Sequence, residues 1–93
     1  MRFEEFISSL SNLHHPKTDC ILQALWYDKK GDWSSSHEIA QDISTPDGAW
    51  VHAYLHRKEG DIGNADYWYR QAGQTRPSVS LDEEWEGIVR AFL

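Results

Sequence analysis

The sequence has 93 residues, enough for one domain, and its 40% hydrophobic and 26% charged residues are typical of a folded globular chain. The formal net charge is −6 and no run of basic residues exceeds two, which argues against nucleic acid and membrane surfaces as partners. Cys20 is the only cysteine, so an internal disulfide is excluded. Without a signal peptide pattern or a long apolar run, we expect a cytoplasmic protein.

Three helices are predicted in the first half of the chain. Apolar residues at spacings of three and four predict an amphipathic helix over residues 2–13. Pro16 suits the first turn of a second, almost wholly apolar helix, which should end at Gly31. Cys20 is expected to be a buried, inert thiol of that helix. Asp32 can cap a third helix.

Three further helices are predicted in the second half. The turn cluster at residues 44–48 precedes a fourth helix that runs to about Glu59, and Asp61 can cap a fifth helix. A loop then leads to Ser80, which forms a capping-box pattern with Glu83 at the start of the last helix. No segment alternates in polarity as a strand does. We therefore predict an all-α fold of about six short helices.

The chain contains an internal repeat. The letters KGDW at residues 30–33 recur as EGDI at residues 59–62, so the period is 29 residues. An apolar helix with a small residue, Ala24 or Ala53, precedes each copy, and another helix follows it. Glycine allows a tight turn and aspartate caps the next helix, so the repeat predicts two helix–turn–helix units.

The second unit resembles a tetratricopeptide repeat. The family has a small residue, a Gly-Asp hinge and then Ala, an aromatic residue, Ala and Pro at set intervals. Those positions here are Ala53, Gly60, Asp61, Ala65, Tyr69, Ala72 and Pro77; the first unit matches through Ala24, Tyr27, Gly31 and Asp32. The sequence departs from the pattern at Ala49, His52 and His56, and its period is shorter than the family's roughly 34 residues.

The resemblance covers residues 18–77 and implies one helical domain with two central hairpins. Its parts would be an N-terminal helix at residues 1–15, hairpins at residues 16–45 and 46–77, and a C-terminal capping helix at residues 80–93. Several stretches also resemble a group of short bacterial proteins, a likeness that implies no activity.

Two units are fewer than the three or so that usually close a helical-repeat core. We therefore expect Trp85 and Phe92 of the last helix to cover the fifth helix. If that cover is incomplete, a homodimer would bury the remaining apolar surface.

One face of the fourth helix is a candidate binding surface. Trp50, Tyr54 and Arg57 share it, and two aromatic rings beside a guanidinium are typical of a binding hot spot. By the resemblance, this face lines a groove to which Leu25 and Asp28 also contribute. The leading hypothesis is a non-enzymatic interaction module that binds a peptide or a partner helix there. The alternative is that the N-terminal helix covers this face, with Asp28 and Arg57 as an ion pair.

A second candidate site is a metal centre. His52 and His56 lie four residues apart on the predicted helix, and Glu59 follows on the same side. Such a pair of histidines can hold zinc, with a carboxylate as third ligand. Ala53 stands where the zinc-protease signature needs a glutamate. The site would belong to a metal-binding or small-molecule enzyme, or else the histidines merely pack between helices. Further candidate ligands are His37, Asp32 and Asp66.

Other features predict little chemistry. Residues 34–37, with the letters SSSH, lack the glycine-flanked turn of a serine hydrolase and are better explained as the first turn of a helix. There is no phosphate-binding glycine loop, and we predict no cofactor. Tyr67 should point outward from the fifth helix, either as a lid or an oligomer contact or as a half-buried side chain whose hydroxyl reaches water. On balance the sequence favours a binding protein over an enzyme.

Overall fold

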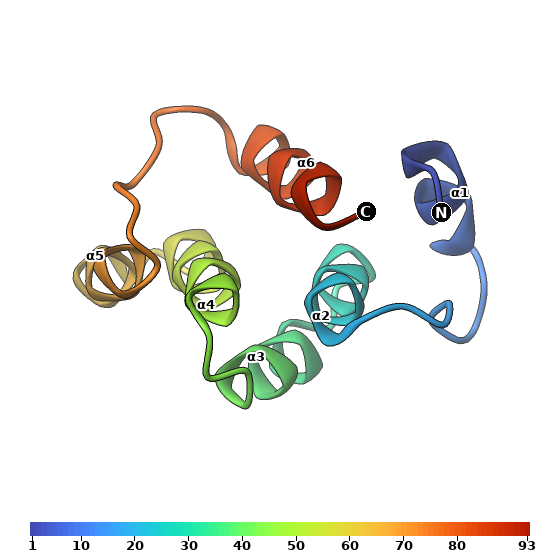
Figure 1. Cartoon of the computed structure of the whole chain (residues 1–93), viewed down its shortest axis with the longest axis horizontal. Helices are drawn as coiled ribbons and strands as arrows, with labels where there is room; N and C mark the ends of the chain where they lie inside the picture. Colours follow the sequence, from blue (N-terminus) through green and yellow to red (C-terminus); the bar gives the residue numbers. More distant parts are fainter.

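A computed structural model describes all 93 residues and contains six helices and no strand (Figure 1). This confirms the predicted all-α fold of about six short helices. None of the helices combines the length and the apolar character that crossing a membrane requires. The helices are α1 (Phe3–Ser9), α2 (Cys20–Lys29), α3 (Trp33–Gln41), α4 (Pro46–Lys58), α5 (Ile62–Gln71) and α6 (Leu81–Phe92).

The two copies of the sequence repeat form two turns of the same geometry. Gly31 joins α2 to α3 with φ of 89°, and Gly60 joins α4 to α5 with φ of 87°. Residues with a side chain resist this left-handed conformation, whereas glycine adopts it freely. Asp32 and Asp61 then cap α3 and α5 by accepting a hydrogen bond from the backbone N–H three residues on. The sequence repeat is thus a repeat of turn geometry.

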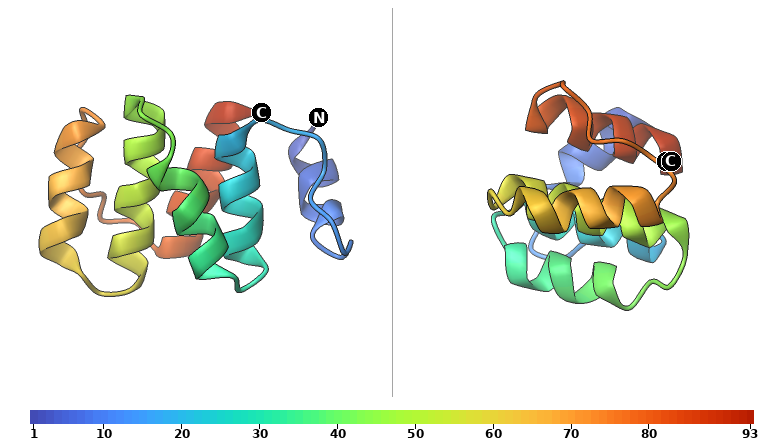
Figure 2. Two further views of the ribbon diagram at one scale, coloured as in Figure 1. Left: turned by 90° about the horizontal axis from the view of Figure 1, so that it is seen from below. Right: turned by 90° about the vertical axis from the view of Figure 1, so that its left-hand side faces the viewer.

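The helices are arranged around α4, which contacts α2, α3, α5 and α6. Seen along the short axis, α2, α4 and α5 follow one another across the molecule, with α1 beyond α2 (Figure 1). α3 packs against α2 and α4 on one side, and α6 packs against the same two helices on the other (Figure 2). α4 therefore has one face toward α3 and another toward α6.

The main hydrophobic core lies where α2, α4 and α6 meet. Leu25 of α2, Leu55 of α4 and Ile88 of α6 are fully buried there, together with Phe6 of α1. Burial of such side chains contributes roughly 1.5–3 kcal/mol each, which explains why the apolar stripe of α6 is drawn to this position. A smaller cluster joins α4 to α5 through Ala53, Ala65 and Tyr69.

The first two helices are shorter than predicted. α1 ends at Ser9, because the chain continues from there in tighter turns with hydrogen bonds between residues three apart. α2 begins at Cys20 and leaves Pro16 outside, because the Asp19 carboxylate accepts a hydrogen bond from the Leu22 N–H and caps the helix. Cys20, expected to be buried, is exposed in the first turn.

α6 lies in a different place from the one we expected. Trp85 and Phe92 do not cover α5. Trp85 packs against Phe6, with ring centroids 6.0 Å apart, and its Nε1–H donates to the Leu25 carbonyl at 3.0 Å. Phe92 meets Trp50 edge-on, with centroids 6.1 Å apart. The apolar stripe of α6 therefore covers α2 and α4.

Candidate functional site

Three imidazoles meet where α3 faces α4. His37 comes from α3, and His52 and His56 come from α4. One ring nitrogen from each residue lies within 4.8 Å of the other two. The Nε2 atoms of His37 and His52 are 2.9 Å apart, so the proton on one of them is shared in a hydrogen bond. The structure therefore brings together two histidines singled out from the helix spacing and a third that was one of several further candidates.

Local helix structure explains how the three rings converge. His52 and His56 are four residues apart, so their side chains project from neighbouring turns of the same face of α4. Thr45 begins α4 by accepting a hydrogen bond from a backbone N–H, and Asp32 begins α3 in the same way. His37 follows in the second turn of α3, on the side that packs against α4.

Two tryptophans enclose the imidazoles, which we name the histidine cluster (His37, His52 and His56). Trp33 stacks on His37 with ring centroids 4.8 Å apart, and Trp68 of α5 stacks on His52 at 4.1 Å. The Trp33 Nε1–H donates to the Leu55 carbonyl at 3.1 Å, which holds its ring in place. His52 and His56 are only 7% and 8% exposed. The rings are therefore held rigidly, and solvent reaches the cluster mainly at His37, which is half-buried.

The surroundings disfavour the charged form of His37 and of His52. Burial, followed by the nearby His37 and His56, lowers the pKa of His52 from 6.5 to about 4. Burial and then His56 also lower the pKa of His37. Desolvation and neighbouring cationic groups both disfavour the imidazolium. At neutral pH these rings consequently keep lone pairs that can accept a proton or a metal ion.

Glu59 holds His56 from outside the cluster. The Nδ1 of His56 lies 2.7 Å from Oε1 of Glu59 and 4.0 Å from Oδ2 of Asp61. In the neutral imidazole, a carboxylate at this distance accepts the proton of Nδ1, and the lone pair then lies on Nε2. The sequence pointed to Glu59 as a third metal ligand. The structure places Glu59 beside His56, where His56, Glu59 and Asp61 form a second group whose ligand atoms lie within 4.8 Å of one another. The group with three imidazoles is completed by His37.

The other carboxylates considered from the sequence are engaged elsewhere. Asp32 accepts hydrogen bonds from the backbone N–H and the hydroxyl of Ser35. Asp66 pairs with Arg76 at 2.9 Å. The histidine cluster therefore offers nitrogen ligands alone.

The residues of the candidate groove are covered by α6. Leu25, Asp28 and Tyr54 are at most 2% exposed. Trp50 is half-buried, and its Nε1–H donates to Oε2 of Glu84 on α6 at 3.3 Å. Arg57 also reaches α6. The face is thus part of the core, although α6 covers it and not the N-terminal helix as in the alternative we considered.

Two buried carboxylates balance the charges on this face. Glu84 pairs with Arg57 at 2.8 Å and accepts the hydroxyl of Tyr69 at 2.6 Å. Asp28 pairs with Lys58 at 2.9 Å and accepts the hydroxyl of Tyr54 at 2.8 Å. The expected pair between Asp28 and Arg57 does not form, because each has a different partner.

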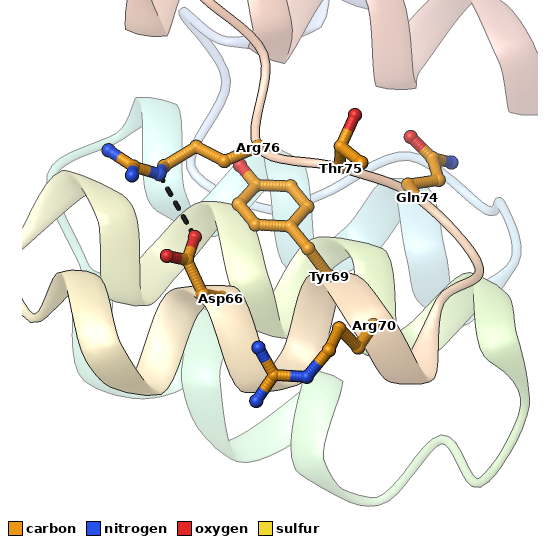
Figure 3. Close-up of a pocket in the computed structure, with 6 residues that line it drawn as sticks. All are labelled: Asp66, Tyr69, Arg70, Gln74, Thr75 and Arg76. Atoms are coloured by element: carbon orange, nitrogen blue, oxygen red, sulfur yellow. Dashed lines mark hydrogen bonds and ion pairs between the residues drawn. The ribbon is translucent and has the colours of Figure 1, made fainter.

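A shallow cavity of about 300 Å³ lies between the second half of α5 and the loop that follows this helix (Figure 3). Asp66 and Arg76 form an ion pair across it, and Tyr69 points toward the loop at residues 74–76. Tyr67 is 46% exposed, which agrees with the prediction that it points outward. Charged groups dominate this cavity, in contrast to the histidine cluster.

One sequence signal points to His37 but does not locate it. Trp33 and His37 are four residues apart, as are His52 and His56, so each helix presents a ring pair on one face. Only the packing of α3 on α4 shows that these faces meet.

No model of a known protein family matches the chain, and neither a curated protein nor a solved structure is significantly similar to it. The site is therefore interpreted from its own geometry and chemistry.

Proposed function

We propose that this chain binds a divalent transition-metal ion through His37, His52 and His56, with zinc as the best-matched ion. The observation that supports the proposal is the convergence of three imidazole nitrogens within 4.8 Å of one another. Neutral imidazole is a common ligand of zinc, copper and nickel. Burial that lowers the pKa of His52 to about 4 favours the neutral form that a metal needs.

The spacing of the nitrogens supports this ligand set. In a tetrahedral zinc site with Zn–N distances of about 2.0–2.1 Å, two ligand nitrogens lie roughly 3.3 Å apart. The Nε2 atoms of His37 and His52 are 2.9 Å apart, which is close to that separation. Glu59 behind His56 is the kind of partner that orients a metal-ligating imidazole.

The number of ligands indicates what kind of metal site this is. Structural zinc sites use four protein ligands, whereas three leave a position for water or another small molecule. Three neutral ligands also leave the full charge of the ion uncompensated, which lowers the pKa of a bound water. We therefore infer a site that presents an open metal position, as a small-molecule enzyme or sensor requires.

Zinc titration of the untagged chain after chelator treatment tests the proposal. We expect one ion per chain by calorimetry. His37→Ala, His52→Ala and His56→Ala should each weaken binding by about 100-fold or more, since each removes one of three ligands. His14→Ala is the matched control, because His14 lies in an exposed segment outside the cluster. Equal zinc affinity in all four variants, or none in the parent chain, would refute the proposal.

We place a protein-interaction module second. The observation in its favour is that the predicted binding face does hold an amphipathic helix, the chain's own α6, through apolar packing and the ion pair of Glu84 with Arg57. A partner helix would have to displace α6. A labelled peptide of residues 78–93 should then bind the intact chain and lose affinity with Trp50→Ala. An absence of peptide exchange would eliminate this second function.

A further inference from the structure

A second cavity lies directly beside the histidine cluster. It has a volume of about 410 Å³ and is bordered by the end of α3, the loop to α4, the first turns of α4 and the last turn of α5. His52 and Trp68, which stack on one another, form part of its wall. The size falls within the range of roughly 300–1,000 Å³ that is usual for small-molecule sites.

The lining of this cavity is uncharged. None of its eleven residues is an aspartate, glutamate, lysine or arginine. The three other cavities of the molecule all contain such residues. One contains Asp66, Arg70 and Arg76 (Figure 3), another contains Arg2, Glu4 and Glu5 at the start of α1, and the third contains Glu38 and Asp42 at the end of α3. In a chain with 26% charged residues, an uncharged cavity beside an imidazole cluster is a distinctive surface.

We propose that this cavity binds a small, planar, uncharged organic molecule with an amide-like polar group. Ile43, Ala49 and Trp68 give it apolar walls, of which one is aromatic. Gln41 and Gln71 lie on its rim with exposed side chains, and each amide offers both a donor and an acceptor. A charged ligand would lose hydration here without gaining a counter-charge.

The local backbone explains why the cavity exists. Gly48 has no side chain, and a Cβ there would lie 2.6 Å from the Cβ of Ile43, too close for any other residue. The absent side chain lets the first turn of α4 approach the end of α3 and close one side of the cavity.

This inference goes beyond the proposed metal site and does not depend on it. His52 belongs to both sites, so a molecule in the cavity would lie next to a bound ion. The cavity itself is formed by the chain alone. The experiment is therefore run twice, with EDTA present and with one equivalent of zinc, so that failure of metal binding and failure of ligand binding are separate results.

Three probes of one shape and different charge test the proposal: benzamide, benzoate and benzamidine. Each is titrated into the intact chain while the indole N–H and side-chain amide signals are followed by NMR. We expect benzamide to shift the Trp68 and Gln71 signals with an affinity about tenfold or more above that of either charged probe. Equal affinity for all three probes, shifts confined to other tryptophans, or no shift would overturn the proposal.

A charge introduced at the rim sharpens the test. Gln71→Glu keeps the shape of an exposed residue at the end of α5, and so should leave the fold intact. This variant should bind the cationic benzamidine more tightly than it binds benzamide. Gln74→Glu is the matched control, since Gln74 lines the other cavity at the end of α5. If Gln71→Glu and Gln74→Glu show the same order of affinity for the three probes, the probes do not occupy the cavity beside His52 and the proposal fails.

Discussion

The two faces of α4 bury polar side chains in opposite ways. Toward α6, Arg57 is paired with Glu84, and the Tyr54 hydroxyl donates to Asp28. Toward α3, His52 and His56 meet His37 with no buried carboxylate among them. The same helix thus presents one face in which every charge has a partner and another in which imidazole lone pairs are available.

This difference separates polar groups that hold the helices together from polar groups that remain available to a ligand. A buried charge is tolerated only when it is paired and hydrogen-bonded, so the pairs under α6 serve to hold the helices together. Uncharged imidazoles cost less to bury and keep their capacity to accept a ligand. The residue types alone, two aromatic rings beside an arginine, indicated the face toward α6 as the binding surface. Its complete pairing indicates that it is core.

Removal of Glu84 should produce the largest effect. Glu84→Ala leaves Arg57, whose side chain is 15% exposed, without its counter-charge, and it removes the acceptor of the Tyr69 hydroxyl. The expected loss of stability is about 3–5 kcal/mol in denaturant unfolding. Glu86→Ala on the exposed side of α6 breaks only a surface pair with Arg90 and should cost less than about 0.5 kcal/mol. Similar costs for both variants would contradict the structural role of this face.

Acid should destabilise the chain through the other face. The folded state lowers the pKa of His52 from 6.5 to about 4, so between these values the unfolded chain binds a proton that the folded chain does not. Stability of the metal-free chain should therefore fall as the pH drops from about 6.5 to 4, by up to about 3 kcal/mol from this residue. Denaturant titrations across this range measure it. His52→Gln should flatten the dependence, and an unchanged slope would contradict the assignment.

A smaller effect is expected from the carboxylate behind the cluster. Glu59→Gln keeps the side-chain shape but replaces the carboxylate that accepts the His56 Nδ1 proton. We expect zinc affinity to fall about 10- to 100-fold, because such partners orient the ligating ring. Calorimetry compares this variant with Glu38→Gln, which lies on α3 outside the cluster. Equal losses in both would show that Glu59 acts only through net charge.

The smallest effects are expected at two glycines near the start of α5. Gly60 has φ of 87°, so Gly60→Ala should destabilise the chain by about 1–2 kcal/mol. Gly63, in the first turn of α5, has an ordinary φ and no neighbouring atom where a Cβ would lie. Gly63→Ala should therefore stabilise the chain by about 0.5–1 kcal/mol. Thermal melts compare the two, and the same sign in both would contradict the turn geometry.

Local features of the fold were predictable from sequence because their causes are local. Asp32, Asp61 and Ser80 cap helices as predicted, since a cap depends on a side chain and a backbone N–H three residues on. The start of α2 was predicted wrongly because Pro16 and Asp19 are competing helix-start signals. The cap of Asp19 decided the outcome.

Long-range features were not predictable in the same way. The position of α6 depends on which apolar face it covers, and the stripe that carries Trp85 is compatible with α5 as well as with α2 and α4. The histidine spacing on α4 was readable, but the addition of His37 depends on the contact of α3 with α4. Helix spacing shows which residues share a face, whereas only tertiary packing shows which faces meet.

The register of the repeat has an evolutionary consequence for the histidine cluster. His37 belongs to the first unit, while His52 and His56 belong to the second, and the residue 29 positions after His37 is Asp66. If the two hairpins descend from one duplicated ancestor, the cluster arose at the junction after the copies had diverged. Neither unit contains the cluster alone. An insertion that shifted one hairpin past the other would abolish it without altering a single histidine.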